Sequence, residues 1–367
     1  MTYVLAPLAG FTNAAFRRVC ARRGAALTYT EMVSAAGLVH GSSPTRHLME
    51  ILPGEGPVVC QLFGRNPDEL AFAAREASAL RRTAPDGTDA PRFVALDLNA
   101  GCPMPKIVKE GAGAALLKDP QLVHDCLKAM KAETTLPLTL KTRPGPRPDK
   151  VLMLELLDAA QTAGCAGLTL HARFTSQLHG GEVHLDLLAQ LVQAAHIPIT
   201  GNGGVYNHTT AEAMAQTGVA AIMIGRAAMA NPWIFGDIAD NRPCDELESA
   251  ERRRTLQDAA FREHLAATLE LQAQLAQRFP DDHVPSVDNF VAYTLHTHLF
   301  RYFNRRQNAA GFRKRLGEIR TLAETQTLLN EISKWTDGSS SMVFCNRRSS
   351  TISTVCSPTP FGRKARR

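Results

Sequence analysis

The chain has 367 residues, of which 44% are hydrophobic and 21% are charged. These fractions are typical of a globular protein and exclude disordered, collagen-like and fibrous classes. No apolar run approaches the roughly 20 residues of a membrane span, and residues 1–10 lack the features of a signal peptide, so we expect a soluble cytoplasmic protein. The eight cysteines are scattered singly, which indicates neither a disulfide framework nor a zinc site, and we expect no metal.

The net charge of +6 is unevenly placed along the chain. Residues 336–367 carry six Lys or Arg against Asp337 alone, which leaves the body of the protein close to neutral. This segment is rich in Ser, Thr and Pro and shows no apolar periodicity. We therefore predict that it is a disordered basic tail.

Short apolar runs alternate with stretches of helical periodicity from residue 3 to about residue 226. Helical spacing of apolar residues predicts helices over Leu70–Leu80, Leu122–Met130, Val151–Ala163 and Leu185–Ala194. Eight runs predict strands: Tyr3–Leu5, Leu27–Glu31, Val58–Phe63, Phe93–Leu98, Leu138–Lys141, Gly167–Leu170, Ile197–Thr200 and Ala220–Ile224. Eight such units in alternation predict an α/β fold, a (β/α)8 TIM barrel. The alternative, an open doubly wound sheet, would normally show a glycine fingerprint after an early strand, and Gly10 and Gly24 stand alone.

The pattern changes after Pro232-Trp233 to long helices without a strand signal, roughly over Leu247–Phe279 and Ser286–Trp335. We therefore predict a barrel domain over residues 1–240, a helical domain over 241–335 and the tail over 336–367. The second helix carries arginines, Arg301, Arg305 and Arg306 among them, interleaved with aromatic residues. Such a face either is simply solvated or binds a polyanion.

Polar and glycine residues gather directly after the predicted strands, at what would be one rim of the barrel, where active sites are built. They are Gln61, Asn99–Gly101, Lys141, His171, Gly201–Gly204 and Gly225–Arg226. Cys102 follows the fourth strand in a turn bounded by Asn99 and Pro103. A lone cysteine is usually a small buried hydrophobe, but Asn, Gly and Pro fix the backbone at a rim and favour a functional role.

Lys141 and Arg143 end the fifth predicted strand, and His171 and Arg173 follow the sixth. A cation inside an apolar barrel is costly unless it meets an anion or an electron-rich ring. A structural ion pair between Lys141 and a carboxylate such as Asp97 is the plain alternative to a ligand. Glycine clusters after the last two strands, with Arg226, favour a bound phosphate. Flavin mononucleotide (FMN) is one ligand that would unite these parts, with its phosphate at those two loops and its ring over the barrel centre.

The same residues resemble the tRNA-dihydrouridine synthase family of the bacterial type. The matching segments are Ala6–Gly10, Tyr29–Met32, Gln61–Gly64, Leu98–Pro103, Lys141–Arg143, His171–Arg173, Asn202–Gly204 and Gly225–Arg226. The block Asn-x-Gly-Cys-Pro, followed by Lys-x-Arg and His-Ala-Arg, is the most specific part of the resemblance. The sequence departs from the family at Gln177–Gly180, where an aromatic residue is usual, and at Gly204, where an acidic residue is usual.

The resemblance implies an oxidoreductase that reduces uridines in tRNA to 5,6-dihydrouridine. FMN, reduced by NADPH, would pass a hydride from N5 to C6 of the uracil, and Cys102 would protonate C5 as the general acid. Asn99, Arg143 and Arg173 would contact uracil or phosphate, and Arg301, Arg305 and Arg306 would bind tRNA. The resemblance places FMN against Pro7, Leu8, Ala9, Gln61, Lys141, His171, Asn202, Gly203, Gly204, Gly225 and Arg226.

Two other functions use part of the same pattern. A related FMN barrel could act on a small molecule such as a free pyrimidine, but it would not need the basic, aromatic-rich helix. A non-catalytic RNA-binding protein would not need Cys102, Lys141 and His171 on one rim. We therefore expect the tRNA-modifying enzyme, acting as a monomer without a membrane or a metal.

Overall fold

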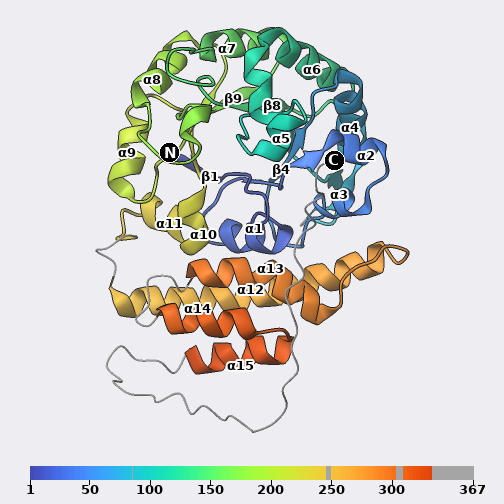
Figure 1. The fold of residues 1–367 in the computed structure, drawn as a ribbon, viewed down its shortest axis with the longest axis vertical. Coiled ribbons are helices and arrows are strands. Elements are labelled where there is room, and N and C mark those ends of the chain that lie inside the picture. Colours follow the sequence, from blue (N-terminus) through green and yellow to red (C-terminus); the bar gives the residue numbers. More distant parts are fainter. Residues whose placement is uncertain (85, 245–248, 303–308, 333–367) are drawn as a thin grey trace, which may run out of the picture. The chain divides into compact units, whose positions relative to one another are not determined.

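The computed structural model describes residues 1–84, 86–244, 249–302 and 309–332 (Figure 1). These residues belong to one compact unit, Met1–Ser333. The predicted tail over 336–367 lies outside the described residues. The predicted boundaries at 240 and 335 stay predictions.

Parallel strands form a closed barrel, as the sequence predicts (Figure 1). Each strand pairs in parallel with its neighbour, and β11 pairs with β1. A parallel bridge between Val4 and Leu27, with the Leu5 amide donating to the Leu27 carbonyl at 2.9 Å, closes the ring beside β2. The barrel strands are β1 (Thr2–Leu5), β2 (Thr28–Tyr29), β4 (Val58–Phe63), β7 (Ala95–Ala100), β8 (Leu138–Thr142), β9 (Gly167–His171), β10 (Ile199–Asn202) and β11 (Ala221–Ile224).

Helices surround the barrel, and local capping sets where several of them begin. The helices predicted over Leu70–Leu80 and Leu122–Met130 each begin two or three residues before the first residue of the apolar pattern. A capping side chain and a proline stand there and start the helix. Asn66 caps α4 (Pro67–Ala79) and Asp119 caps α6 (Pro120–Ala132). The other outer helices are α1 (Ala14–Ala21), α2 (Ala35–Val39), α3 (Ser43–His47), α5 (Pro105–Lys109), α7 (Met153–Thr162), α8 (Leu185–Ala194), α9 (His208–Ala215), α10 (Arg226–Ala230) and α11 (Ile234–Ala239).

Two short additions to the barrel were not predicted. β3 (Val33–Ser34) pairs with the end of β4. β5 (Arg81–Thr83) and β6 (Asp89–Pro91) form a separate antiparallel hairpin. Most of the hairpin is exposed, so it carries no apolar run that could mark it in the sequence.

A helical region follows the barrel: α12 (Ala250–Arg278), α13 (Val287–Tyr302), α14 (Ala309–Glu318) and α15 (Leu322–Ile332). The expectation of continuous helix over Ser286–Trp335 is wrong, because the chain leaves the helix between α14 and α15. There the Glu324 carboxylate accepts from the Thr321 amide at 3.0 Å, while the Thr321 hydroxyl accepts from the Glu324 amide at 3.2 Å. This reciprocal capping box starts a new helix.

The helical region packs on α1 through apolar and charged contacts. Ala14 and Ala15 of α1 share an apolar cluster with Leu271 and Leu275 of α12. Arg18 of α1 pairs with Glu270 at 2.6 Å. The first barrel helix is therefore covered by the helical region on one side.

Candidate active site

The register of the barrel strands places the predicted rim residues in neighbouring pairs. Gln61 on β4 lies beside Asp97 on β7, and Asn99 on β7 lies beside Lys141 on β8. On β9, the strand next to β8, His171 lies beside Asn202 of β10. Gln61, Asn99, Lys141, His171 and Asn202 lie in the C-terminal halves of parallel strands, so one end of the barrel collects them, with Asp97 one layer deeper on β7.

Cys102 lies in a turn held by the side chain of Asn99. The Oδ1 atom of Asn99 accepts the amide of Gly101 at 3.1 Å and the amide of Cys102 at 3.0 Å. Burial raises the pKa of the half-buried Cys102 thiol, while the Met104 amide and the charges of Arg143 and Lys141 act in the opposite direction. The thiol is therefore held as a protonated group at neutral pH.

Lys141 projects into the barrel end, where Asn202 holds its amine. The Nζ atom donates to Oδ1 of Asn202 at 3.0 Å, and Nδ2 of Asn202 donates to the Met223 carbonyl at 2.8 Å. Burial, with the charge of Arg143, lowers the pKa of Lys141 to about 8. Within the described residues Lys141 forms no ion pair with Asp97, so that alternative from the sequence does not hold.

Arg143 is fully buried and joins two rim loops. Its Nε atom donates to the Gly101 carbonyl at 2.8 Å, and its Nη1 atom donates to the carbonyls of Arg173 at 3.2 Å and Phe174 at 3.1 Å. Burial lowers its pKa to about 10. Whatever it does to a substrate, Arg143 fixes the Cys102 turn against the loop that follows β9.

His171, Arg173 and the glycines after β10 form a tight cationic corner. Gly203 has a φ of +116°, and a Cβ built there would lie 2.9 Å from Cδ2 of His171 and 3.3 Å from Nη1 of Arg173. Burial and the nearby cations hold the pKa of His171 well below its usual value, so the ring is neutral. The Nη1 atom of Arg173 is buried and has no hydrogen-bond partner among the described residues. A side chain at position 203 would fill the space in front of these groups.

The loops after β1 and β11 complete the rim. A Cβ at Gly225 would lie 3.7 Å from Cδ2 of Leu8, so these two predicted positions are neighbours. Pro7 is half-buried and Ala9 is exposed beside Leu8. Arg226 is exposed, and its charge acts with burial to lower the pKa of Arg173. Arg173 after β9 and Arg226 after β11 therefore bring positive charge to one side of the rim.

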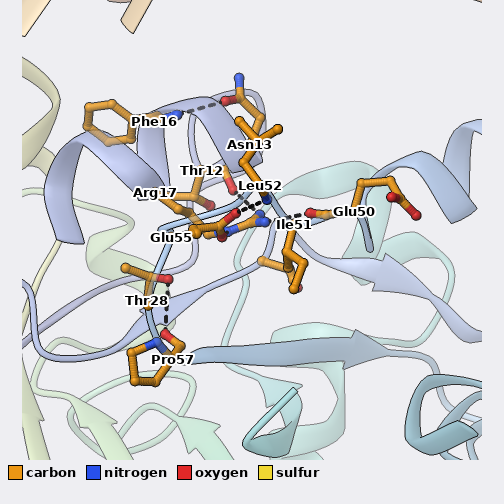
Figure 2. Close-up of polar contacts among 12 residues, drawn as sticks. Thr12, Asn13, Phe16, Arg17, Thr28, Glu50, Ile51, Leu52, Glu55 and Pro57 are labelled. Carbon is orange, nitrogen blue, oxygen red and sulfur yellow. Dashed lines mark hydrogen bonds and ion pairs between the residues drawn. The ribbon is translucent and has the colours of Figure 1, made fainter. Parts of the chain in front are cut away.

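A buried ion pair fastens the loop after β1 (Figure 2). Arg17 of α1 pairs through Nε with the Glu55 carboxylate, and both side chains are fully buried. Its other nitrogens donate to the Thr12 carbonyl at 2.8 Å and the Glu50 carbonyl at 2.7 Å. Thr12 in turn accepts the Leu8 amide at 3.0 Å on its hydroxyl. Arg17 thus supports the backbone of the predicted residues Pro7–Ala9, and sequence reasoning missed it.

Two further rim residues were not among the predicted site. Asp97 is fully buried and accepts from Gln61, and its only sequence signal is a carboxylate inside an apolar strand. His179 stacks on His171 with ring centroids 6.3 Å apart. Burial, followed by the charge of Arg143, lowers the pKa of His179. The sequence around His179 did not predict a site residue, because only the path of the loop in the folded chain brings this side chain to the rim.

Arg301, which is predicted to bind tRNA, does not lie on a barrel strand or on a loop that follows one. Arg301 is exposed near the end of α13, in the helical region. Arg305 and Arg306 lie outside the described residues. In the described part of the chain, no group of three or more metal-ligating side chains is found, and no helix is long and apolar enough to cross a membrane.

Comparison with known proteins identifies the family. The family described as dihydrouridine synthase matches residues 4–336. This chain belongs to that family. It is therefore an enzyme of the dihydrouridine synthase family, and the resemblance seen in the sequence is confirmed. The family match spans both the barrel and the helical region.

Three relatives illustrate how far the likeness to other dihydrouridine synthases extends. A probable tRNA-dihydrouridine synthase of Treponema pallidum is 37% identical over 63% of this chain and 68% of its own length. The tRNA-dihydrouridine synthase B of Pseudomonas syringae pv. tomato is 35% identical over 72% of this chain and 75% of its own. A probable tRNA-dihydrouridine synthase 1 of Synechocystis is 31% identical over 89% of this chain and 84% of its own.

Proposed function

We propose that this chain reduces uridines in tRNA to 5,6-dihydrouridine, with FMN as the bound cofactor and NADPH as the reductant. The observation that carries the proposal is the Cys102 turn, because it holds a protonated thiol beside Lys141 and Arg143 at the barrel rim. The three relatives are named as tRNA-dihydrouridine synthases, which supports tRNA as the substrate over a free pyrimidine. We further propose that the enzyme acts in the cytoplasm, as a monomer.

The residues at the rim fit FMN. A phosphate is an anion, and the corner at Gly203 offers a buried guanidinium nitrogen of Arg173 that has no partner among the described residues. Glycines at 203 and 204 leave the backbone open to close approach. Lys141 supplies a fixed cation at the barrel centre, which suits a ring that gains negative charge on reduction. When bound, FMN would supply the hydride that C6 of the uracil receives.

We assign the cofactor contacts to the ends of β1, β9, β10 and β11 with the loops that follow them and to the side chains of Gln61 on β4 and Lys141 on β8, with Arg173 added at the phosphate. Lys141 and Asn202 would hold the ring, and neutral His171 would lie beside it. The full set is Arg173 together with Pro7, Leu8, Ala9, Gln61, Lys141, His171, Asn202, Gly203, Gly204, Gly225 and Arg226.

Cys102 would deliver the second hydrogen, as a proton to C5. Hydride addition at C6 develops negative charge on the uracil, and a positioned acid at C5 removes it. The raised pKa keeps the proton on Sγ until that charge develops. The thiolate that remains faces the Met104 amide and the charges of Arg143 and Lys141, which stabilise it until solvent returns the proton. Asn99 would hold the turn and border the uracil.

Binding of tRNA would involve the helical region. Arg301 is exposed there, and Arg305 and Arg306 follow it in the sequence. Cations on such a surface contact phosphates and give the affinity its salt dependence. The Arg143 and Arg173 guanidiniums would bind uracil or phosphate only with the donors that their backbone bonds leave available.

The test is nucleoside mass spectrometry of unmodified tRNA transcripts after incubation with the protein, FMN and NADPH. Wild type should yield uridine heavier by two hydrogens, and Cys102→Ala should lose that product while it keeps bound flavin and oxidises NADPH. Cys165→Ala removes a buried thiol away from the rim and is the matched control. A flavin-containing wild type that yields no dihydrouridine would refute the function, and equal yields from wild type and Cys102→Ala would refute the acid.

A further inference from the structure

A chain of buried hydrogen bonds leads from the barrel interior to the Cys102 turn. Oδ1 of Asp97 accepts the Thr139 hydroxyl at 2.6 Å, and Oδ2 accepts Nε2 of Gln61 at 2.7 Å. Oε1 of Gln61 then accepts Nδ2 of Asn99 at 2.9 Å. The last link is the pair of bonds from the amides of Gly101 and Cys102 to Oδ1 of Asn99. We call the side chains of Asp97, Gln61 and Asn99 the relay.

Each amide of the relay has a donor end and an acceptor end, so the relay has a direction. An ionised carboxylate only accepts hydrogen bonds, and it therefore draws the NH2 end of Gln61 toward Asp97. The oxygen end of Gln61 must then face Asn99, whose NH2 end turns toward it. As a result the oxygen end of Asn99 faces the turn, where two backbone amides need an acceptor.

Burial raises the pKa of Asp97 to about 7, while its bonds to Thr139 and Gln61 oppose that rise. Above that pH the carboxylate is ionised, and the opposite direction of the relay is then unfavourable. A reversed Gln61 would set its oxygen against the carboxylate. A reversed Asn99 would set its NH2 group against the amides of Gly101 and Cys102, and the two amides would lose their acceptor. Asp97, Gln61 and Asn99 are all buried, so water could not replace those bonds.

We propose that Asp97 is a positioning residue for Cys102. Its carboxylate fixes the direction of the Gln61 and Asn99 amides and thereby holds the turn that carries the thiol. The carboxylate forms no ion pair within the described residues, and Lys141 donates instead to Asn202. The hydrogen bonds that the Asp97 carboxylate accepts come from Gln61 and Thr139, while the charge of Lys141 acts on it without a direct contact. This inference rests on the proposed role of Cys102 and adds a second residue, on the preceding strand, to the same site.

The relay can be tested by variants that remove the carboxylate from position 97 or place it at position 99. In Asp97→Asn the new amide can present either end to Gln61, so only the amides of Gly101 and Cys102 still fix the direction of Asn99 and the turn is held less tightly. In Asn99→Asp carboxylates face Gln61 from both sides, and its oxygen must oppose one of them. In the double variant Asp97→Asn/Asn99→Asp the carboxylate at position 99 accepts the turn amides and the NH2 end of a reversed Gln61. The amide at position 97 then donates to Gln61 and accepts from Thr139, so every link is satisfied again.

The measurement is the rate of alkylation of Cys102 by iodoacetamide across pH 6–10 on the full chain. Peptide mass spectrometry separates Cys102 from the other cysteines, and the readout does not depend on turnover. Asp97→Asn should change the rate by about fivefold at a fixed pH, the population change expected from one buried neutral hydrogen bond. The double variant should return to within about twofold of wild type by the same reasoning. Thr169→Val, a buried polar-to-apolar change on β9 outside the relay, should leave the rate unchanged.

A rate profile for Asp97→Asn that matches wild type would overturn the inference, as would a double variant no closer to wild type than Asp97→Asn alone. If Asp97→Asn does not fold, a folded double variant would support the relay, whereas failure of both to fold would make Asp97 purely architectural and overturn it. Dihydrouridine formation is measured in parallel. A wild type without that activity refutes the proposed function, and an unchanged thiol profile in Asp97→Asn refutes the relay alone.

Discussion

Replacement of Arg17 by methionine would leave the Glu55 carboxylate buried without its cation. Both side chains are 0% exposed, and Arg17 also donates to the carbonyls of Thr12 and Glu50 (Figure 2). Removal of one partner from a buried ion pair costs about 3–5 kcal/mol. We therefore expect Arg17→Met to lose that much free energy of unfolding in urea titrations at pH 7. It should also retain less FMN, because the Thr12 carbonyl and the loop after β1 lose their support.

Two comparisons make the Arg17 prediction specific. Addition of Glu55→Gln to Arg17→Met should recover about 2 kcal/mol, since the buried charge is then absent. Arg81→Met breaks an exposed pair with Asp89 and should cost less than about 1 kcal/mol.

The pH dependence of Arg17→Met gives a further check. Burial raises the pKa of Glu55, and Arg17 opposes that rise, so without Arg17 the folded-state pKa rises further. Between the pKa of Glu55 in the unfolded chain and its higher pKa in the folded variant, the folded variant binds a proton that the unfolded chain does not hold. The stability of the variant therefore falls as pH rises between these two pKa values. The deficit against wild type should therefore shrink from pH 7 to pH 5. A loss below about 1 kcal/mol at pH 7, or a deficit that grows with acid, would refute the reasoning.

Three other predictions concern separate parts of the chain. Gly203→Ala should lose FMN on dialysis, as measured by flavin absorbance, because a Cβ at φ +116° would lie 2.9 Å from the His171 ring. Gly164→Ala is the control, since Gly164 also has a positive φ but has open space around it, and this variant should keep the flavin. Acidification from pH 7 to 5 should lower the free energy of unfolding by up to about 1.4 kcal/mol per pH unit for each of His264 and His298. Burial lowers the folded-state pKa of both histidines, to about 3 for His298, so the unfolded chain binds protons that the folded chain does not. His298→Gln should therefore weaken the dependence of the urea midpoint on pH. Arg301→Ala should reduce the slope of log tRNA affinity against log salt by about 1 in filter binding, and an unchanged slope would remove Arg301 from the tRNA surface.

The barrel could be predicted from the sequence because its strands are buried on both faces. Val58–Phe63 is an unbroken apolar run apart from Gln61, and the structure gives β4 the same bounds. The order of strands then follows from parallel pairing between sequence neighbours. The hairpin β5–β6 could not be predicted in this way, since exposed strands carry no such run. The break at Thr321 was missed although its capping box is visible in the sequence, because apolar periodicity continues across it.

The rim residues were predictable as strand ends, but their partners were not. Lys141 could be assigned to the rim from its place after an apolar run, yet its bond to Asn202 depends on the width of the barrel. Asp97 looked like a partner for that lysine, and only the strand register shows that it faces Gln61. Arg17 lies beside Arg18 on a short helix, and nothing local distinguishes a fully buried guanidinium from its neighbour.

The contact between the helical region and the first barrel helix limits how these enzymes can be recombined. His298 of α13 donates to the Phe11 carbonyl at 3.1 Å, inside the loop after β1. Glu50, whose carbonyl accepts from Arg17, also accepts on its carboxylate from Gln274 and Arg278 of α12. A chimera joined at residue 240 would place a foreign surface on that loop and leave the buried Glu50 carboxylate with fewer partners. A transplantable helical module must therefore carry α1 and residues 7–13 with it, so the natural unit of exchange is discontinuous in sequence.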